Sequence, residues 1–433
     1  LAAALAGQGK LDDAGETLGW ALDIDPDLVE AHNNLGTVQQ IRGDLEDAAR
    51  SYGRALAIDP GHASAHVNLG HVLKRQGKLK DAIVSYRRAL VIDPGFAEAH
   101  NGLGVSLLVQ GKSEEAAVSF ANALKISPQH AEAHNNLGNV LRNQGRLDEA
   151  VASIQRALAL APDLVEAHIN LGNTRKSQRR VDDAAEAYRR ALSLDPANPE
   201  AHWNFAQVLL LVGRLREGWA EYAWRTKCEE FRAVNWNFKQ PLWDGSDLGG
   251  RTVLLYAEQG FGDTIQFLRY LPMVAAPGTD KGGDVILQCP PPLTRLFEAA
   301  PAADGIQLVT KIGDTPFDLQ APLHGLPGLF ATTLDTIPAD VPYLRPPGDT
   351  SPALETSGGF KVGLVWAGNS KHKNDANRSV GFERFQPLLD IKGVDFYSLQ
   401  VGERSRDIGA PGLSGLDGKI SDLGKDLGDF ADT

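Results

Sequence analysis

The feature that constrains this chain most is a strict period of 34 residues in its first half. A proline preceded by a short polar or small residue closes each period, and a Leu-Gly pair recurs at a fixed place inside it. The closing pairs are Asp25-Pro26, Asp59-Pro60, Asp93-Pro94, Ser127-Pro128, Ala161-Pro162 and Asp195-Pro196. Such a period predicts stacked units, each of which buries its apolar face on the next one.

Small and bulky residues also recur inside each period. The small positions are Gly36, Gly70, Gly104, Gly138 and Gly172, with Ala48, Ala82, Ala116, Ala150 and Ala184. The bulky position holds Tyr52, Tyr86, Phe120, Ile154 and Tyr188. Glycine and alanine allow two helices to approach closely, the bulky side chain fills the space beside them, and proline ends the second helix.

This pattern resembles the tetratricopeptide repeat, a helix-turn-helix unit of the same length. The resemblance implies a helical superhelix with a concave groove over residues 1–228. We expect a partial repeat at 1–28, five full repeats at 29–198 and a degenerate cap at 199–228. Leu1 falls on the repeat position of Leu35, without a preceding methionine, so we expect a fragment at the amino end whose targeting sequence is not visible.

Charge and cysteine content exclude several classes of protein. The chain carries 43 basic and 55 acidic residues, a net charge of -12, and has no long basic run, which argues against nucleic acid or an anionic membrane as the main partner. Its 2 cysteines, Cys228 and Cys289, provide neither a disulfide framework nor a metal cluster. The sequence contains no stretch of about 20 consecutive apolar residues, so no membrane-spanning helix is predicted. A cytoplasmic protein fits these observations.

Histidine and asparagine form two polar columns through the repeats. The histidines are His32, His66, His100, His134, His168 and His202. Because successive copies lie on helix layers about 8–10 Å apart, they cannot share one metal ion, and we expect them to be structural, each with a satisfied ring nitrogen. The asparagines are Asn34, Asn68, Asn136, Asn170 and Asn204, and Gly102 interrupts their column.

Asparagine is a poor helix former, so a column of it needs a reason. One reason is structural, an amide that bridges neighbouring helices. The other is a ladder of donors and acceptors that binds the backbone of an extended peptide in the groove. The repeat "EAHNNLGNVLRNQGRLDEA" resembles those of the O-linked N-acetylglucosamine transferases, and this resemblance implies contact with protein substrates. Both alternatives stay open.

The composition changes after residue 228, where an irregular aromatic stretch at 229–250 predicts a linker. Short apolar runs then alternate with helical segments, which indicates a parallel sheet with ligands bound beyond the carboxyl ends of its strands. The stretch "EQGFGDT" follows the first such run. It is neither a Walker loop, which needs Lys-Ser/Thr after the glycines, nor a dinucleotide fingerprint, which needs glycine where Ile265 stands.

The longer stretch "PLWDGSDLGGRTVLLYAEQGFGDTIQFLRYLP" resembles the heptosyltransferase-like glycosyltransferases of family nine. The resemblance covers about residues 235 to 433 and implies the two-lobed α/β fold called GT-B, with a Rossmann-like first lobe at 251–357 and the start of the second at 358–433. It also implies that Asp263 is the catalytic base. Inverting glycosyl transfer does need a carboxylate that accepts a proton from the acceptor hydroxyl, and Gly260 and Gly262 would let the acceptor come close. The structural alternative is that Asp263 caps a helix that begins at Thr264.

A second motif, "VGLVWAGNSKHKNDANRSV", resembles the opening of the donor-binding lobe. Ser370, Lys371, Lys373 and Arg378 would bind the diphosphate of a nucleotide sugar without a metal or another cofactor, because lysine, arginine and backbone amides offset its negative charge. The alternative is a solvated polar loop.

We therefore expect a helical solenoid followed by a GT-B glycosyltransferase domain, with the repeats recruiting a protein acceptor and a nucleotide sugar serving as donor. The alternative is a repeat scaffold for protein assembly with a vestigial glycosyltransferase-like domain. The second lobe is shorter than the usual nucleotide-binding unit of about 100 residues, so we expect these 433 residues to bind nucleotide weakly and transfer no sugar. Asp432-Thr433 is not expected to be the donor-binding Asp-Thr of the family, because no histidine follows it.

Overall fold

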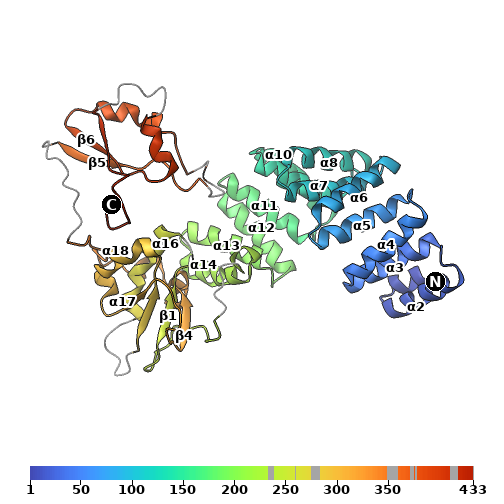
Figure 1. The fold of residues 1–433 in the computed structure, drawn as a ribbon, viewed down its shortest axis with the longest axis horizontal. Helices are drawn as coiled ribbons and strands as arrows, with labels where there is room; N and C mark the ends of the chain where they lie inside the picture. The colour runs from blue at the N-terminus through green and yellow to red at the C-terminus, as the bar shows by residue number, and fades with distance from the viewer. Residues whose placement is uncertain are drawn as a thin grey trace. The chain divides into compact units, whose positions relative to one another are not determined.

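The structure is a computed structural model that describes residues 1–232, 238–258, 260–274, 283–348, 359–370, 375, 378–409 and 418–432. The chain divides into two compact units, Leu1–Cys228 and Glu229–Thr433. The first is helical and the second contains two parallel sheets (Figure 1). Each unit is described by itself below.

The first unit consists of helix pairs that follow the repeat period. A partial pair, α1 (Ala2–Gly7) and α2 (Leu11–Ile24), precedes the five full repeats. The full pairs are α3 (Val29–Arg42) with α4 (Leu45–Ile58), α5 (Ala63–Arg75) with α6 (Leu79–Ile92), α7 (Ala97–Val109) with α8 (Ser113–Ile126), α9 (Ala131–Asn143) with α10 (Leu147–Leu160), and α11 (Val165–Ser177) with α12 (Val181–Leu194). The solenoid predicted from the period is confirmed.

The last pair, α13 (Pro199–Leu211) and α14 (Leu215–Tyr222), runs into a 3-10 segment at Ala223–Lys227. Aromatic side chains cover this end of the array. The ring of His202 stacks on that of Trp224 with centroids 3.9 Å apart, and the guanidinium of Arg225 lies 4.3 Å from the ring centroid of Tyr222.

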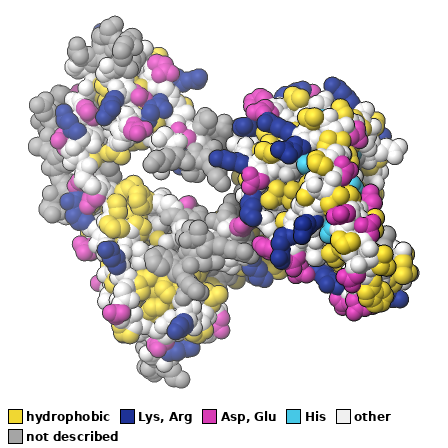
Figure 2. All heavy atoms as spheres, turned by 45° about the vertical axis from the view of Figure 1, so that its right-hand side comes forward, with side chains coloured by type: hydrophobic (Ala, Val, Ile, Leu, Met, Phe, Trp, Pro, Cys, Tyr) yellow, Lys and Arg dark blue, Asp and Glu magenta, His cyan; other side chains and the backbone are white. Residues whose placement is uncertain are grey.

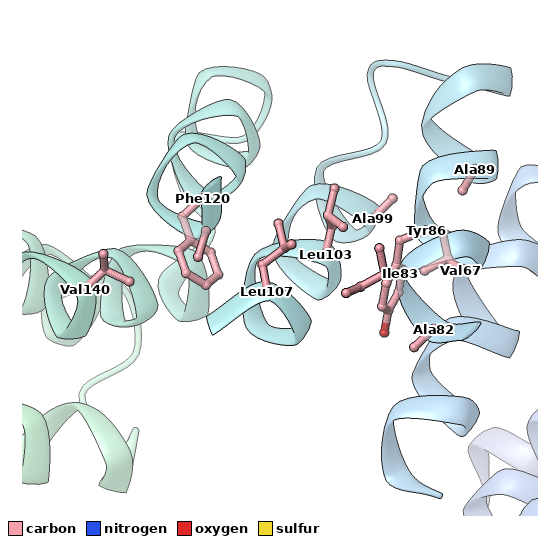
Figure 3. Packing of buried hydrophobic residues seen from close by; sticks show 11 residues of the cluster. Val67, Ala82, Ile83, Tyr86, Ala89, Ala99, Leu103, Leu107, Phe120 and Val140 are labelled. Atoms are coloured by element: carbon pink, nitrogen blue, oxygen red, sulfur yellow. The ribbon is translucent and has the colours of Figure 1, made fainter. Parts of the chain in front are cut away.

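Close helix packing explains the glycine and aromatic columns. A Cβ added to Gly36 would lie 2.7 Å from the ring of Tyr52, and one added to Gly172 would lie 2.5 Å from the ring of Tyr188. The bulky residues of this column are fully buried. Figure 3 shows how Tyr86 and Phe120 fill the spaces between successive helices, together with Leu103 and Leu107. The predicted roles of these residues are confirmed.

The turns inside the helix pairs need a left-handed residue. Glycine supplies it at Gly43, Gly77, Gly111, Gly145 and Gly213, whose φ angles are all positive. Arg179 holds the same position in the α11–α12 turn with φ 61. A side chain in this conformation is strained, because its Cβ approaches the neighbouring carbonyl oxygen.

The second unit holds a four-stranded parallel sheet in the order β3-β2-β1-β4. Its strands are β1 (Val253–Tyr256), β2 (Val285–Gln288), β3 (Gln307–Val309) and β4 (Leu319–Pro322). The central strands β1 and β2 are buried along their whole length, as apolar runs covered on both faces should be. Helix α16 (Phe261–Phe267) follows β1.

A three-stranded parallel sheet in the order β5-β6-β7 follows. Its strands are β5 (Phe360–Leu364), β6 (Val394–Ser398) and β7 (Ile420–Asp422). The helix expected between β5 and β6 is instead a 3-10 segment, Phe382–Asp390, with Pro387 inside it. Proline lacks an N–H and clashes with the preceding turn, which disfavours an α-helix there. The small parallel sheets agree with the sequence, and the complete GT-B fold stays a prediction.

Candidate functional site

The inner face of the repeat unit can be identified from helix contacts. Each odd-numbered helix from α3 to α11 packs against the next odd-numbered one, whereas the even-numbered helices pack chiefly against odd-numbered neighbours. A curved stack brings helices closer together on its concave side. We therefore call the surface formed by α3, α5, α7, α9, α11 and α13 the inner face.

The asparagine column lies at the seams between these inner helices. The Nδ2 atom of Asn68 donates a hydrogen bond to Oδ1 of Asn33 at 3.1 Å. The same geometry recurs two and three repeats further along, where Asn136 donates to Asn101 at 3.1 Å and Asn170 donates to Asn135 at 3.0 Å. The bridging contact that the structural alternative requires is therefore present at three positions.

The residue before each column position decides whether a bridge can form. The acceptors Asn33, Asn101 and Asn135 occupy that preceding position in their own repeats, and all three are buried. In the α11 repeat this position holds Ile169, which offers no side-chain acceptor to Asn204. Asn204 instead accepts a hydrogen bond from Nζ of Lys176 at 3.5 Å. These acceptors were not predicted from the sequence, although the dipeptide Asn-Asn in two of the repeats was a signal for Asn33 and Asn135.

Gly102 interrupts the column because Tyr86 occupies the space that a side chain would need. A Cβ at Gly102 would lie 2.6 Å from Cε1 and Cζ of the Tyr86 ring. Asparagine at this position would also face Val67, which cannot accept a hydrogen bond. The gap in the column thus has a packing cause.

The bridging asparagines keep unused polar groups. Asn68, Asn136 and Asn170 are half-buried, and each uses one amide N–H in its bridge. An asparagine amide offers a second N–H and a carbonyl oxygen with two lone pairs. Asn34, the first of the column, is also half-buried. Binding of a peptide by these groups stays a prediction.

The histidine column is structural in this array. Nε2 of each histidine lies 2.8 to 3.2 Å from the carbonyl oxygen of the proline six residues earlier. A carbonyl only accepts, so Nε2 carries the proton and donates. The described residues contain no group of three or more histidine, cysteine, aspartate or glutamate side chains that could hold a metal ion. The expected satisfied ring nitrogen is present in all six histidines of the column.

Glu98, in the first turn of α7, joins three successive repeats through His71 of α5 and His130, the N-cap of α9. Its Oε1 lies 3.4 Å from Nε2 of His71, and its Oε2 lies 3.1 Å from Nε2 of His130. The hydrogen bond from His130, followed by that from His71, holds the pKa of Glu98 well below its ordinary value. The same bond raises the pKa of His130. Nδ1 of His130 meanwhile accepts a long hydrogen bond of 3.4 Å from the Ala133 N–H at the start of α9.

The second candidate site lies where β1 ends. Helix α16 begins at Phe261 with Gly260 as its N-cap, three residues before Thr264, and no side chain makes a capping bond. Asp263 is therefore not the helix cap that the structural alternative proposed. Asp263 lies in the first turn and is exposed as a whole residue, while neighbouring atoms partly shield its carboxyl group from water. Burial by its neighbours raises the pKa of Asp263, and the positive charge of Arg378 opposes this effect.

The glycines before Asp263 leave open space. Gly260 has an ordinary φ of -64, and an added Cβ at Gly262 would meet no atom within 4 Å. Neither glycine is needed for packing against the described residues. Free space beside the carboxylate is what the approach of an acceptor would require.

The second motif is described only in part. Ser370 lies in a turn after β5, and Arg378 is exposed, with its backbone N–H bonded to the carbonyl oxygen of Asp375 at 2.9 Å. Lys371 and Lys373 lie outside the described residues. The positive charge of Arg378 acts on the carboxyl group of Asp263, so one residue of the second motif interacts electrostatically with the first.

Asp432 has a local structural role. Its carboxylate forms an ion pair with Arg295 and accepts a hydrogen bond from the Gly428 N–H at 2.7 Å. The ring of Phe430 packs on that of Phe261 with centroids 5.2 Å apart. Within the second unit, the segment after β7 is thus bound to the elements that follow β1 and β2.

The surface of the repeat unit carries both signs of charge, with Lys and Arg side chains gathered in groups between acidic ones (Figure 2). No helix within the described ranges is long and apolar enough to cross a membrane.

Comparison with known proteins identifies the repeats. Residues 101–165 match a family model described as tetratricopeptide repeat, and residues 41–77, 70–111 and 173–213 match one described as TPR repeat. The helical unit is thus built from tetratricopeptide repeats. The resemblance seen in the sequence is confirmed for this part of the chain.

Protein FlbA of Caulobacter vibrioides is 30% identical over 230 residues, which cover 47% of this chain and 37% of that protein. Among solved structures, the Cut9–Hcn1 hetero-tetramer of the APC/C is 19% identical with a TM-score of 0.49, over 53% of this chain and 45% of that one. YrrB, described as a TPR protein with an unusual peptide-binding site, is 23% identical with a TM-score of 0.36, over 43% and 96%. The chain spans well under half the length of FlbA.

Proposed function

We propose that the inner face of the repeat unit binds an extended segment of a partner protein and that the chain serves protein assembly. The observation that carries this proposal is the row of half-buried asparagines at the inner seams. Each bridge fixes an amide in place and leaves polar groups free to pair with a peptide backbone. Amides held in advance lose little conformational entropy on binding, which favours affinity.

The bridges also explain why binding need not depend on the partner's sequence. Backbone N–H and C=O groups repeat along any extended chain, and a row of amides that both donate and accept can match them. Side-chain preferences must then come from other groups on the inner face.

A random peptide library displayed against the 433-residue chain tests this proposal. We expect recovered peptides to lose affinity when Asn136 and Asn170 are both changed to Ala, and to keep it when exposed Gln155 and Arg156 on α10 are changed to Ala. The amount of folded protein is checked by circular dichroism. Equal binding to both variants would refute the proposal.

Asn34 offers a matched control for the structural role of the column. Asn34→Ala removes a column amide that makes no bridge to a preceding repeat among the described residues, whereas Asn136→Ala also leaves the buried Oδ1 of Asn101 without its donor. We expect a loss of about 1–3 kcal/mol in unfolding free energy for Asn136→Ala and less for Asn34→Ala. Similar losses would argue against the bridge as a structural contact.

As a second function, we propose glycosyl transfer from a nucleotide sugar by the second unit, with Asp263 as general base. The position of Asp263 beyond the carboxyl end of a central parallel strand favours it, and the positive charge of Arg378 acts on the carboxyl group of Asp263. An acceptor recruited by the repeats would lose a proton to Asp263, while Arg378 would offset charge on the departing diphosphate.

This second proposal is tested in the full-length natural protein by release of nucleoside diphosphate from a panel of nucleotide sugars. We expect Asp263→Asn to lower turnover by about 10²–10⁴-fold with donor binding retained. The control is Asp340→Asn, which changes an exposed carboxylate elsewhere in the unit. Unchanged turnover in Asp263→Asn would exclude the role of general base.

A further inference from the structure

Two cations lie next to each other on the inner face. Arg142 and Lys176 occupy the same position in successive repeats, on the neighbouring inner helices α9 and α11. Both side chains are half-buried. The charge of Arg142 is felt at Lys176, where burial and this charge together lower the pKa of the ammonium group.

Neutral amides, rather than carboxylates, surround these cations. Nη2 of Arg142 donates to Oδ1 of Asn139 at 2.7 Å and to Oδ1 of Asn143 at 3.2 Å. Nζ of Lys176 donates to Oε1 of Gln207 at 3.2 Å and to Oδ1 of Asn204 at 3.5 Å. An amide oxygen orients a cation but does not neutralise it.

The guanidinium of Arg142 also has an unused donor. Its Nε is buried and has no hydrogen-bond partner among the described residues. Burial lowers the pKa of Arg142, and the negative charge of Glu200, at the start of α13, acts in the opposite direction. A buried, unpaired donor on a charged group costs free energy, so the guanidinium of Arg142 is only partly satisfied by its amide partners.

Other basic residues of this region differ in having acidic partners. Arg146 pairs with Glu149, and Arg175 lies 3.8 Å from a carboxylate oxygen of Asp183. The ion pairs found in the described part of the chain include neither Arg142 nor Lys176. Two half-buried cations that form no ion pair among the described residues are notable in a chain whose net charge is -12, although the more distant charge of Glu200 acts on Arg142.

We propose that Arg142 and Lys176 form a subsite that binds carboxylate side chains of an acidic segment in the partner protein. This inference rests on the proposed function, because it names the chemistry of the segment that the inner face binds. A carboxylate placed between the two groups would relieve their mutual repulsion and accept charge-assisted hydrogen bonds from both. The asparagines alongside would hold the backbone on either side of it.

The peptide library distinguishes this inference from the function on which it rests. We expect peptides recovered on the wild-type chain to be enriched in Asp and Glu, and replacement of those residues by Gln or Asn to weaken binding. The double variant Arg142→Gln/Lys176→Gln should bind a recovered acidic peptide about 10- to 100-fold more weakly. The double variant and the wild type should bind the neutral version of that peptide, in which Gln or Asn replaces Glu and Asp, with equal affinity.

The matched control removes one lysine and one arginine charge from helices that do not belong to the inner face. Lys125→Gln/Arg156→Gln changes exposed side chains on α8 and α10 and should leave binding of the acidic peptide unchanged. Peptides that need the asparagines but show no acidic enrichment would overturn the subsite and leave the proposed function standing. Peptides that ignore both the asparagines and the two cations would overturn both.

Discussion

Gly36 shows how a single hydrogen atom in place of a side chain sets the helix spacing. The ring of Tyr52, fully buried, lies where a Cβ of residue 36 would be, and its hydroxyl is held by Thr37 at 3.1 Å and by Gln40 at 3.0 Å. The ring therefore cannot turn aside without losing these bonds. A residue-scale contact of this kind was predictable, because both partners recur at fixed places in the period.

Gly36→Ala should lower the free energy of unfolding by about 1–3 kcal/mol, since the added methyl overpacks the core by more than the gain in helix propensity offsets. Gly53→Ala, in the next helix, provides the control. Gly53 is exposed with no atom within 4 Å of an added Cβ, so this change should stabilise by about 0.5–1 kcal/mol. Urea unfolding of both variants measures the difference, and equal effects would contradict the packing argument.

Glu98 gives the repeat unit a pH-dependent contact. Its pKa is lowered in the folded state, so its contribution is present above the ordinary glutamate value of 4.5 and lost as the pH falls further. The pKa of His130 is raised, so its contribution is present below the ordinary value of 6.5 and lost as the pH rises above it. Protonation of Nδ1 would break the bond from Ala133, but that bond is long and weak.

We therefore expect the stability difference between wild type and Glu98→Gln to be largest between these two ordinary values. It should shrink toward alkaline pH as His130 loses its proton, and toward acidic pH as Glu98 gains one. Urea unfolding of both proteins across this range measures it. A difference that does not vary with pH would show that the contact is not ionic.

At the scale of elements, Arg179 is a departure from the repeat pattern. Its φ of 61 is the conformation that glycine supplies in the equivalent turns at Gly145 and Gly213. The sequence shows that glycine is missing from the α11–α12 turn. Only the structure shows that arginine nevertheless adopts the left-handed conformation, and that α11 and α12 keep the lengths of their neighbours.

Arg179→Gly should raise the unfolding free energy by about 0.5–1 kcal/mol, because relief of the left-handed strain exceeds the entropy cost of glycine. The reverse change, Gly145→Arg, should destabilise the equivalent turn of the α9–α10 pair. Thermal unfolding of the two single variants measures both effects. A lower midpoint for Arg179→Gly would mean that the arginine side chain contributes contacts that outweigh the strain.

The candidate site could be predicted from the sequence only in part. The columns of Asn and His follow directly from the period. The bridge from Asn136 to Asn101 could not be derived, since it depends on which face of one helix meets the next. The electrostatic effect of Arg378 on Asp263 joins segments that are distant in the sequence, so it could not be predicted either. The segment Phe382–Asp390 is a 3-10 helix instead of the expected α-helix because Pro387 inside it disfavours the α-helical conformation.

At the scale of the whole molecule, two units with different architectures follow one another along the chain. The helical unit depends on contacts between neighbours in sequence, which a strict period encodes well. The second unit pairs strands that are distant in sequence, so its order β3-β2-β1-β4 was not derivable beyond the expectation of parallel strands. This contrast explains why the repeat unit was the more predictable of the two.

The central claim, that the inner face binds a segment of a partner protein, is tested most directly by site-specific photo-crosslinking. A photoreactive amino acid is placed at Ser177, an exposed position two helical turns from Asn170 on the same face of α11, and separately at Gln155, exposed on α10. A peptide recovered from the library should crosslink to the chain carrying the probe at residue 177 and not to the one carrying it at 155. Crosslinking at residue 155 alone, or equally at both positions, would contradict binding on the inner face.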